Sequence, residues 1–364
     1  MDFTYDAEQE ALRDVARGAL ESAVDPSRLR ELADDPDGST PELWQSMVDL
    51  GWTGLLVPEG LGGADAGLLD TCIVLEQMGR IPFPGPFFSS AVLATLAARA
   101  LGAEPLLADL AAGRRRGTVA LQEMGHGDPL GTVRTRARRR GPDWVVSGLK
   151  PLVLDGHTAD WVIVVARSEE GVRSFLLEQP TADAVPTLDP TRKAARIVLD
   201  ETRVTPLGPV GNQAGLWRRI LDDAAVGLAS ETVGVADRAL AEATEYAKQR
   251  VVFDRPIASF QVVKHRIVDM FHGLEMARAG AQFAAWASDT GAPERERAAA
   301  MAASYASAAG VRATGDNIQT HGGQGFTWRN DAHFLFKRAK QNEILVGGAA
   351  FERRRLAAML VESA

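Results

Sequence analysis

The stretch Tyr246-Ala-Lys-Gln-Arg-Val-Val-Phe-Asp-Arg-Pro-Ile-Ala-Ser-Phe-Gln261 lies between two long helical patterns. Upstream of it, from Val226 to Ala247, apolar residues recur at steps of three and four, as they do on the buried face of a helix. Pro256 interrupts the pattern because it lacks an amide proton and disfavours the helical conformation before it. We therefore expect the first helix to end near Gln249 and Ser259 to cap the next one.

Three side chains in this stretch predict more than a connection between helices. Arg250 follows a helix C-terminus, where a cation is favoured, and its planar guanidinium can bind a phosphate through two hydrogen bonds. Phe253 offers a flat apolar face, and Gln261 offers a donor and an acceptor, which together would suit an adenine ring. The alternative is a C-cap arginine, a core phenylalanine and a surface glutamine.

A second stretch, Gln319-Thr-His-Gly-Gly-Gln-Gly-Phe-Thr-Trp328, ends an alanine-rich helical pattern and opens a loop. Its glycines at 322, 323 and 325 would let backbone amides approach a phosphate without obstruction from side chains. By itself such a loop is typical of a helix C-cap followed by a turn. The two stretches are more informative as a pair.

As a pair they resemble the acyl-CoA dehydrogenase family of flavoproteins. Its members carry R-x-x-F-G-x-P-I-x-x-F-Q and, about 60 residues later, Q-x-H-G-G-x-G-[YF]. Here the pair reads Arg250 to Gln261 and Gln319 to Phe326, and the resemblance extends over essentially the whole chain. It implies FAD as the cofactor. The residues that it implies for FAD binding are Arg250, Phe253, Ile257, Phe260, Gln261, Gln319, Gly322 and Gly323.

Composition limits the other possibilities. The chain has 364 residues, 46% of them hydrophobic and 24% charged, which is enough for two or three packed domains. A net charge of -8 disfavours nucleic acid as a general partner. The single cysteine, Cys72, excludes an internal disulfide, the N-terminus is acidic where a signal peptide is basic, and no segment reaches the length of a membrane span. We therefore expect a cytoplasmic protein. The spacing of His265 and His272 gives no metal site.

The periodicity predicts an α+β fold that is mainly α. We expect an N-terminal helical domain over 1–115, a small middle β-domain or barrel over 116–208, and a C-terminal four-helix-bundle domain over 209–364. The predicted helices span 7–22, 42–50, 68–80, 89–101, 216–249, 259–288, 294–319 and 331–343, with a last helix from 348. The predicted strands span 118–121, 144–147, 161–166, 174–177 and 196–199.

The middle segment departs from the family in places. Residues 144–155 resemble its G-x-K-x-x-I-T-N strand pair, but Leu154 stands where members have a threonine that hydrogen-bonds the flavin ring. Residues 122–128 stand where most members have T-E-P-x-A-G-S-D. Five arginines between Arg134 and Arg140 indicate either a solvated hairpin or a binding site for the phosphates of coenzyme A.

The resemblance implies a reaction in which a carboxylate removes a proton from the α-carbon of an acyl thioester while the flavin takes a hydride from the β-carbon. Many members carry this base in a tail motif, Y-E-G-T. The aligned segment here reads Leu345-Val-Gly-Gly348 and contains no carboxylate. Other members carry the base early in the helix before Arg250, where this chain has Ala224.

The nearest carboxylates to that position give three candidates for the base. Asp222 and Asp223 are its neighbours in sequence, and Glu231 follows two turns later on the same helical face, within an apolar run. We rank Glu231 first, Asp223 second and Asp222 third. The alternative for Glu231 is a core glutamate hydrogen-bonded to a serine or an arginine.

Three hypotheses follow. The first is an FAD-dependent acyl-CoA dehydrogenase that oxidises an acyl-CoA to its 2-enoyl product, passes electrons to an electron-transfer flavoprotein and forms a homo-oligomer, either a dimer or a tetramer. The second is a non-catalytic or half-site subunit of a mixed oligomer with a sister chain. The third is a flavin oxidase or biosynthetic enzyme on the same fold, since a fold does not dictate the reaction.

Overall fold

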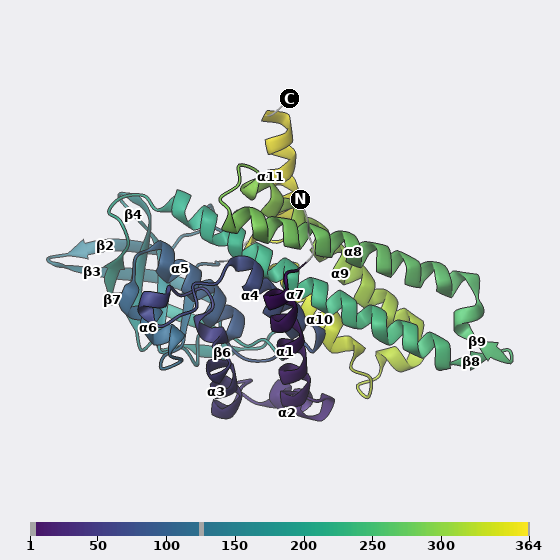
Figure 1. The fold of residues 1–364 in the computed structure, drawn as a ribbon. Helices are drawn as coiled ribbons and strands as arrows, with labels where there is room; N and C mark the ends of the chain where they lie inside the picture. The colour runs from purple at the N-terminus through teal and green to yellow at the C-terminus, as the bar shows by residue number, and fades with distance from the viewer. Residues whose placement is uncertain (1–4, 124–126, 363–364) are drawn as a thin grey trace. The chain divides into compact units, whose positions relative to one another are not determined.

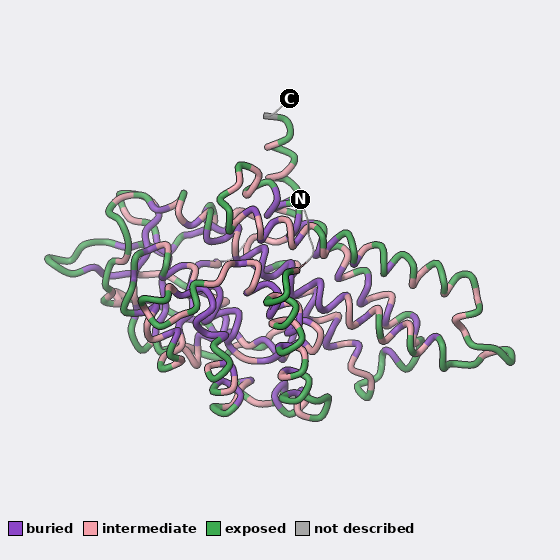
Figure 2. Tube along the Cα trace, viewed as in Figure 1, coloured by how far each residue is buried: buried purple, intermediate pink, exposed green. Residues whose placement is uncertain are grey.

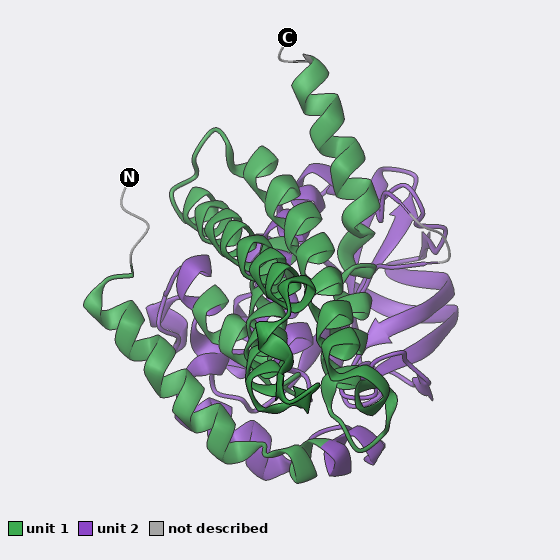
Figure 3. Ribbon diagram, turned by 90° about the vertical axis from the view of Figure 1, so that its right-hand side faces the viewer, with its two compact units in different colours: residues 1–29, 72–83, 225–364 green, residues 30–71, 84–224 purple. Residues whose placement is uncertain are grey.

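The structure is a computed structural model that describes residues 5–123 and 127–362. The predicted fold class is confirmed, because the fold is mainly helical with a small barrel in the middle of the chain (Figure 1). Contacts divide the chain into two compact units: unit 1 comprises residues 1–29, 72–83 and 225–364, and unit 2 comprises residues 30–71 and 84–224 (Figure 3). The division into three consecutive domains remains a prediction.

Most of the predicted helices are present, but α2 and α6 were not predicted, and the segment predicted as one helix over 89–101 is a π-helical stretch, Phe87–Ala94, followed by the short α5. Their bounds are α1 Ala7–Ala23, α2 Pro26–Asp34, α3 Pro41–Asp49, α4 Leu68–Arg80, α5 Thr95–Ala100, α6 Glu104–Ala111, α7 Ala214–Gln249, α8 Gln261–Asp289, α9 Arg295–His321, α10 Ala332–Asn342 and α11 Ala349–Glu362. Among the described residues, no helix combines the length and the apolar character needed to cross a membrane.

Unit 2 contains the barrel. Its strands are β1 Gly117–Ala120, β2 Arg136–Arg140, β3 Asp143–Leu154, β4 Trp161–Ser168, β5 Gly171–Glu178, β6 Asp183–Val185 and β7 Ala194–Leu207. The pairing β4-β2-β3-β7-β5 returns to β4, which closes the sheet, while β1 and β6 pair at β4 and β7. The core is made of inward-facing residues such as Trp144, Val164 and Phe175. Strands β2 and β6 were not predicted. Ala137 is the only buried residue of β2, so its sequence shows no apolar alternation, and β6 has no buried residue.

In unit 1, α7, α8 and α9 run side by side, with buried residues along their inner faces (Figures 1 and 2). Helix α4 crosses α7 at two glycines. A β-carbon at Gly79 would overlap the carbonyl oxygen of Glu231, and a β-carbon at Gly234 would overlap the carbonyl oxygen of Glu76. The two backbones therefore touch directly, which only glycine permits at both positions.

After α7 ends at Gln249, as predicted, the chain forms a short hairpin of β8 (Val251–Val252) and β9 (Arg255–Pro256). Phe253 and Asp254 make its two-residue turn, with φ of 52° and 60°. Positive φ at both positions is the geometry of a type I′ turn, which usually takes Asn-Gly. The prediction that Ser259 caps the next helix was wrong. Ser259 belongs to a 3₁₀ turn, and the extended residue Phe260 precedes α8.

Candidate active site

The two motif stretches meet inside unit 1. The ring of Tyr246, near the end of α7, lies over the ring of His321, at the end of α9, with 4.3 Å between their centroids and 30° between their planes. One turn further back, Asn317 Nδ2 donates a hydrogen bond of 3.0 Å to Glu242 Oε2. The corner after α7 and the glycine loop after α9 therefore start from adjacent helix ends.

Functional groups at these two helix ends are open to bind a ligand. The guanidinium of Arg250 is exposed and has no hydrogen-bond or ion-pair partner among the described residues. Phe253 is 84% exposed, so it is not a core phenylalanine. Gln261 and Gln319 are also exposed. The predicted phosphate and ring contacts are thus unobstructed.

The glycines of the loop after α9 (η5, Gly322–Phe326) differ in their surroundings. Gly322 and Gly323 are exposed, and a β-carbon at either would meet nothing within 4 Å, so their backbone is free to approach a ligand. Gly325 is buried, and its β-carbon would lie 2.5 Å from the carbonyl oxygen of Ile318. The amide of Gly322 donates to the carbonyl oxygen of Gln319. A guanidinium, a glycine backbone without side-chain obstruction and an aromatic face fit a dinucleotide with charged phosphates and a planar base.

Of the other two residues implied for FAD binding, Ile257 and Phe260 are both half-buried. The guanidinium carbon of Arg255 lies 4.3 Å from the centroid of the Phe260 ring, a cation–π contact. This contact keeps a second cation beside the corner.

Glu231 is held in a buried ion pair. It is 2% exposed, and Arg338 on α10 is fully buried. Arg338 Nη1 donates to Glu231 Oε1 at 2.5 Å, and Asn342 Nδ2 donates to Glu231 Oε2 at 3.0 Å. The other amino group of Arg338, Nη2, donates to the carbonyl oxygens of Pro82 at 3.2 Å and Phe83 at 3.1 Å.

These contacts match the arginine-bonded alternative for Glu231, since both of its carboxylate oxygens already accept hydrogen bonds. To act as a base, Glu231 would have to receive a proton on an oxygen that Arg338 or Asn342 now contacts. Its catalytic role remains a prediction. So do the roles of Asp222, which is buried, and Asp223, which is half-buried.

The tail segment has an unusual backbone conformation at Val346, the position that the resemblance aligns with the family's base. Val346 lies in η6 (Leu345–Gly347) with φ of 55°, a left-handed conformation that a β-branched residue rarely adopts. Four residues into α11, Glu352 is 4% exposed and pairs with Arg355 at 2.7 Å. Glu352, Val346 and Asn342 line one small cavity of about 10 Å³. Glu352 was not predicted, because it lies outside the tail positions that align with the family motif.

On the barrel, Leu154 is buried, and its carbonyl oxygen accepts a hydrogen bond of 2.7 Å from Thr118 Oγ1. Lys150 Nζ donates to Glu123 Oε1 at 2.7 Å and to the carbonyl oxygen of Leu121 at 3.1 Å. Burial lowers the pKa of Lys150 to about 8. Of the aligned segment 122–128, residues 124–126 lie outside the described residues.

The basic stretch forms a hairpin, in which β2 pairs with β3. The five arginines of the stretch are exposed, and two of them have partners: Arg138 pairs with Glu201, and Arg139 lies 5.2 Å from the centroid of the Trp144 ring. This is the arrangement expected of a solvated hairpin. Binding of coenzyme A phosphates there remains a prediction.

A helical bundle, a small closed barrel and two paired motifs define the acyl-CoA dehydrogenase class of fold. Two family models match the chain: "Acyl-CoA dehydrogenase, N-terminal domain" over residues 6–106 and "Acyl-CoA dehydrogenase, C-terminal domain" over residues 215–361. The acyl-CoA dehydrogenase IpdE2 of Mycobacterium tuberculosis is 34% identical over 99% of this chain and 100% of its own length. The chain belongs to the acyl-CoA dehydrogenase family and is an oxidoreductase.

Solved structures agree with this assignment. The ChsE4–ChsE5 complex from Mycobacterium tuberculosis contains a chain that matches with a TM-score of 0.88 and 28% identity, over 100% of this chain and 99% of that one. Butyryl-CoA dehydrogenase from Megasphaera elsdenii has the same fold, with a TM-score of 0.89 at 24% identity over 99% of this chain and 100% of that one.

Proposed function

We propose that this chain is an FAD-dependent acyl-CoA dehydrogenase that oxidises an acyl-CoA thioester to its 2-enoyl product. The contact between Tyr246 and His321 carries the proposal, because it brings the two motifs implied for FAD binding to adjacent helix ends. The single cysteine supports a reducing compartment such as the cytoplasm. The proposed electron acceptor is an electron-transfer flavoprotein.

Each part of the site has a separate task. The guanidinium of Arg250 binds the phosphates, which can approach the glycine backbone at Gly322 and Gly323, while Phe253 and Gln261 bind the base. FAD, when bound, supplies the acceptor for the hydride from the β-carbon. A carboxylate of this chain takes the α-proton, with Glu231 as the first candidate and Asp223 as the second.

Flavin binding tests the proposal directly. The purified protein should show flavin absorbance, and Arg250→Gln should weaken FAD binding by at least about tenfold, since a charge-assisted contact to phosphate contributes more than about 1.4 kcal/mol. Arg203→Gln is the matched control, because Arg203 is 84% exposed and lies on the barrel. A protein that is colourless and takes up no added FAD contradicts the proposal.

The base can be identified in the same preparation. Bleaching of the flavin by a panel of acyl-CoA substrates gives the substrate class. Glu231→Gln and Asp223→Asn should then be compared for the rate of bleaching and for the free energy of unfolding. The base is the residue whose variant loses bleaching at unchanged FAD affinity.

A second function is supported by the tail segment. Val346 stands where many members have the base, and the similar ChsE4–ChsE5 structure is a complex of two differently named chains. We propose as the alternative that this chain is a half-site subunit of a mixed oligomer rather than a dimer or tetramer of one chain. Turnover by this chain alone excludes the alternative. Oxygen consumption without an added electron acceptor would instead identify an oxidase.

A further inference from the structure

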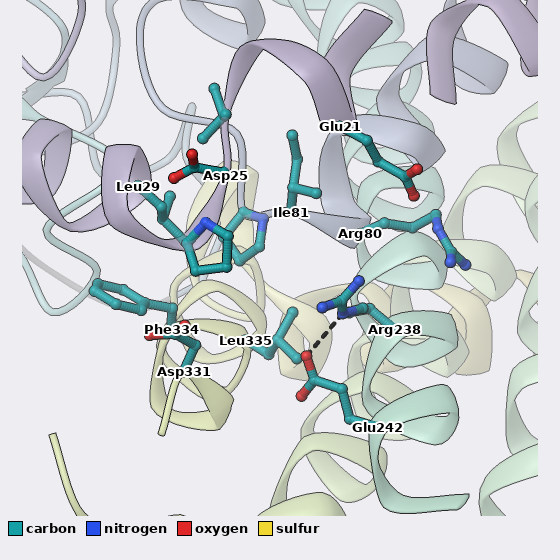
Figure 4. A pocket seen from close by; sticks show the side chains of 13 residues that line it. Glu21, Asp25, Leu29, Arg80, Ile81, Arg238, Glu242, Asp331, Phe334 and Leu335 are labelled. Atoms are coloured by element: carbon teal, nitrogen blue, oxygen red, sulfur yellow. Dashed lines mark hydrogen bonds and ion pairs between the residues drawn. The ribbon is translucent and has the colours of Figure 1, made fainter. Parts of the chain in front are cut away.

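Asp155, in unit 2, is a buried carboxyl without an ion-pair partner among the described residues. It is 4% exposed, and no described cation lies within salt-bridge distance of its oxygens. The two arginines that line the cavity of about 240 Å³ in unit 1 are different, because each is paired with a carboxylate. Arg238 Nε donates to Glu242 Oε1 at 2.7 Å (Figure 4), and Arg80 is paired with Asp237.

One contact links the Asp155 carboxyl to another element. Asp155 follows the last residue of β3, with φ of 49°. Its Oδ2 lies 2.6 Å from Ser89 Oγ, within the π-helical stretch η3 (Phe87–Ala94). Its Oδ1 is buried and has no hydrogen-bond partner among the described residues. The end of β3 is therefore joined to η3 through a single oxygen of Asp155.

The contacts of Ser89 indicate where the hydrogen of this link comes from. A serine hydroxyl has one hydrogen to donate. Ser89 Oγ also lies 3.1 Å from the carbonyl oxygen of Pro86, which can only accept. Both contacts are hydrogen bonds at the same time only if Ser89 donates to Pro86 and Asp155 donates a proton of its own to Ser89. The geometry therefore favours a neutral carboxyl.

Burial favours the same protonation state. An ionised Asp155 would be a buried anion with a single hydrogen bond, and a buried charge is costly unless it is paired and fully hydrogen-bonded. Burial is the largest influence on Asp155 and raises its pKa. The influences that oppose this rise are the hydrogen bond with Ser89 and the charges of Arg192, His157 and Arg116.

Two basic side chains near Asp155 are hydrogen-bonded to backbone groups instead. Lys193 Nζ donates at 2.8 Å to the carbonyl oxygen of Ala33. His157 Nε2 lies 3.1 Å from the carbonyl oxygen of Pro36, so this nitrogen is the donor, and the buried Nδ1 has no partner among the described residues. Neither side chain is hydrogen-bonded to the Asp155 carboxyl.

We propose that Asp155 is protonated at neutral pH and forms a pH-sensitive link between β3 and η3. The proton lies on Oδ2 and is donated to Ser89 Oγ. When the carboxyl loses this proton, Ser89 must donate to Asp155 instead of Pro86, and the buried anion gains no second partner. The folded state is then less stable, and the link at the end of β3 weakens.

The family pattern agrees with a neutral group at this position. In G-x-K-x-x-I-T-N, the asparagine aligns with Asp155, directly after the position that Leu154 occupies here. A protonated aspartate resembles asparagine in shape and, like it, offers both a donor and an acceptor. Asp155→Asn should therefore keep the link to Ser89 and remove its dependence on pH.

Infrared spectroscopy of the purified protein, with whatever cofactor it carries, tests the proton directly. A protonated carboxyl has a C=O stretching band that is separate from the carboxylate bands. At neutral pH the wild type should show such a band, Asp155→Asn should lack it, and raising the pH should remove it from the wild type. The control is Asp189→Asn, which should leave the band in place. Asp189 is also buried, but its Oδ1 accepts from the amide and the hydroxyl of Thr191.

The pH dependence of stability gives a second measurement. An unfolded aspartate loses its proton near pH 4, whereas folded Asp155 keeps it to higher pH. The wild type should therefore lose stability relative to Asp155→Asn as the pH rises, by up to about tenfold in the unfolding equilibrium constant per pH unit. Urea denaturation of both proteins between pH 5 and pH 9 measures this ratio.

Three outcomes would overturn the proposal: no carboxyl band that depends on Asp155, a constant stability ratio, or a ratio that changes in the opposite direction. If Asp155→Asn does not fold, Ser89→Ala replaces it in the infrared test. Loss of the acceptor should then shift the carboxyl band, and an unchanged band would reject the link. Because neither measurement uses FAD, a protein that binds no flavin would contradict the proposed function without affecting this test.

Discussion

The rings of Tyr246 and His321 are in tilted contact with their centroids 4.3 Å apart, although 75 positions separate the two residues in the chain. Each belongs to one of the two motif stretches, and the contact joins the ends of α7 and α9. The two short sequence motifs therefore lie next to each other in the folded chain. It also shows that Arg250 and the glycine loop belong to the same compact unit, unit 1.

The Glu231–Arg338 pair should be essential to stability. Arg338→Gln leaves a buried carboxylate without its cation, so the free energy of unfolding should fall by about 3–5 kcal/mol in urea denaturation. The double variant Glu231→Leu/Arg338→Leu should recover most of this loss. The control is Arg312→Gln, whose pair with Asp269 is exposed and should contribute under about 1 kcal/mol. Equal effects of Arg338→Gln and Arg312→Gln would contradict this prediction.

The close crossing of α4 and α7 predicts that replacing a glycine by alanine lowers the free energy of unfolding at the crossing and raises it at an open helix position. Gly234→Ala forces a methyl group into the carbonyl of Glu76 and should lower the free energy of unfolding by about 2 kcal/mol or more. Gly280→Ala, inside α8 with nothing within 4 Å of the added carbon, should raise it by about 0.5–1 kcal/mol. Thermal and urea unfolding of the two variants measure both effects. A stabilising Gly234→Ala would mean that α4 and α7 are not in direct contact.

The hairpin turn predicts that Asp254→Gly stabilises the protein. Asp254 has φ of 60°, where glycine carries no steric penalty, so this variant should gain up to about 1 kcal/mol. Asp254→Ala should lose about 1 kcal/mol at the same position, because alanine lacks the local hydrogen bonding that lets aspartate tolerate this conformation. Hydrogen exchange at Val251 and Val252 should change in the same order. No difference between the two variants would argue against the turn.

Lys150 predicts a pH dependence of stability. Burial lowers its folded pKa to about 8, below the unfolded value of 10.5, so the unfolded state binds more protons between these two values. The stability contributed by this group therefore rises with pH from about 8 to about 10.5, by up to about 3 kcal/mol. Subtracting the curve of Lys150→Met isolates this rise from other groups, such as Tyr5, whose pKa is raised to about 12. A flat difference curve would contradict the assignment.

Much of the helical architecture could be predicted because helix bounds depend on local patterns. Helix α4 spans Leu68–Arg80 as expected, and α7 ends at Gln249 as expected. Strand β2 could not be found, because four of its five residues are arginines and its place in the sheet depends on pairing with β3. The β8–β9 hairpin was not predicted, because its turn sequence, Phe-Asp, is not typical of a type I′ turn.

The site was predicted less completely, for a different reason. Periodicity shows that Glu231 is buried, but its partner Arg338 is 107 positions away and carries no local signal. Spacing likewise gave no sign that Phe253 would be 84% exposed or that Arg238 would face a cavity. Contacts between distant segments decide these features, and a single sequence does not report them.

The crossing of α4 and α7 has one more consequence. With no β-carbon on either side, neither helix can move along the other without driving a carbonyl oxygen into a backbone atom. A displacement of α7 by one residue, about 1.5 Å, would carry the Glu231 carboxylate away from the arginine anchored on Pro82 and Phe83. The absence of side chains at Gly79 and Gly234 thus fixes the position of the Glu231 carboxylate within the protein interior.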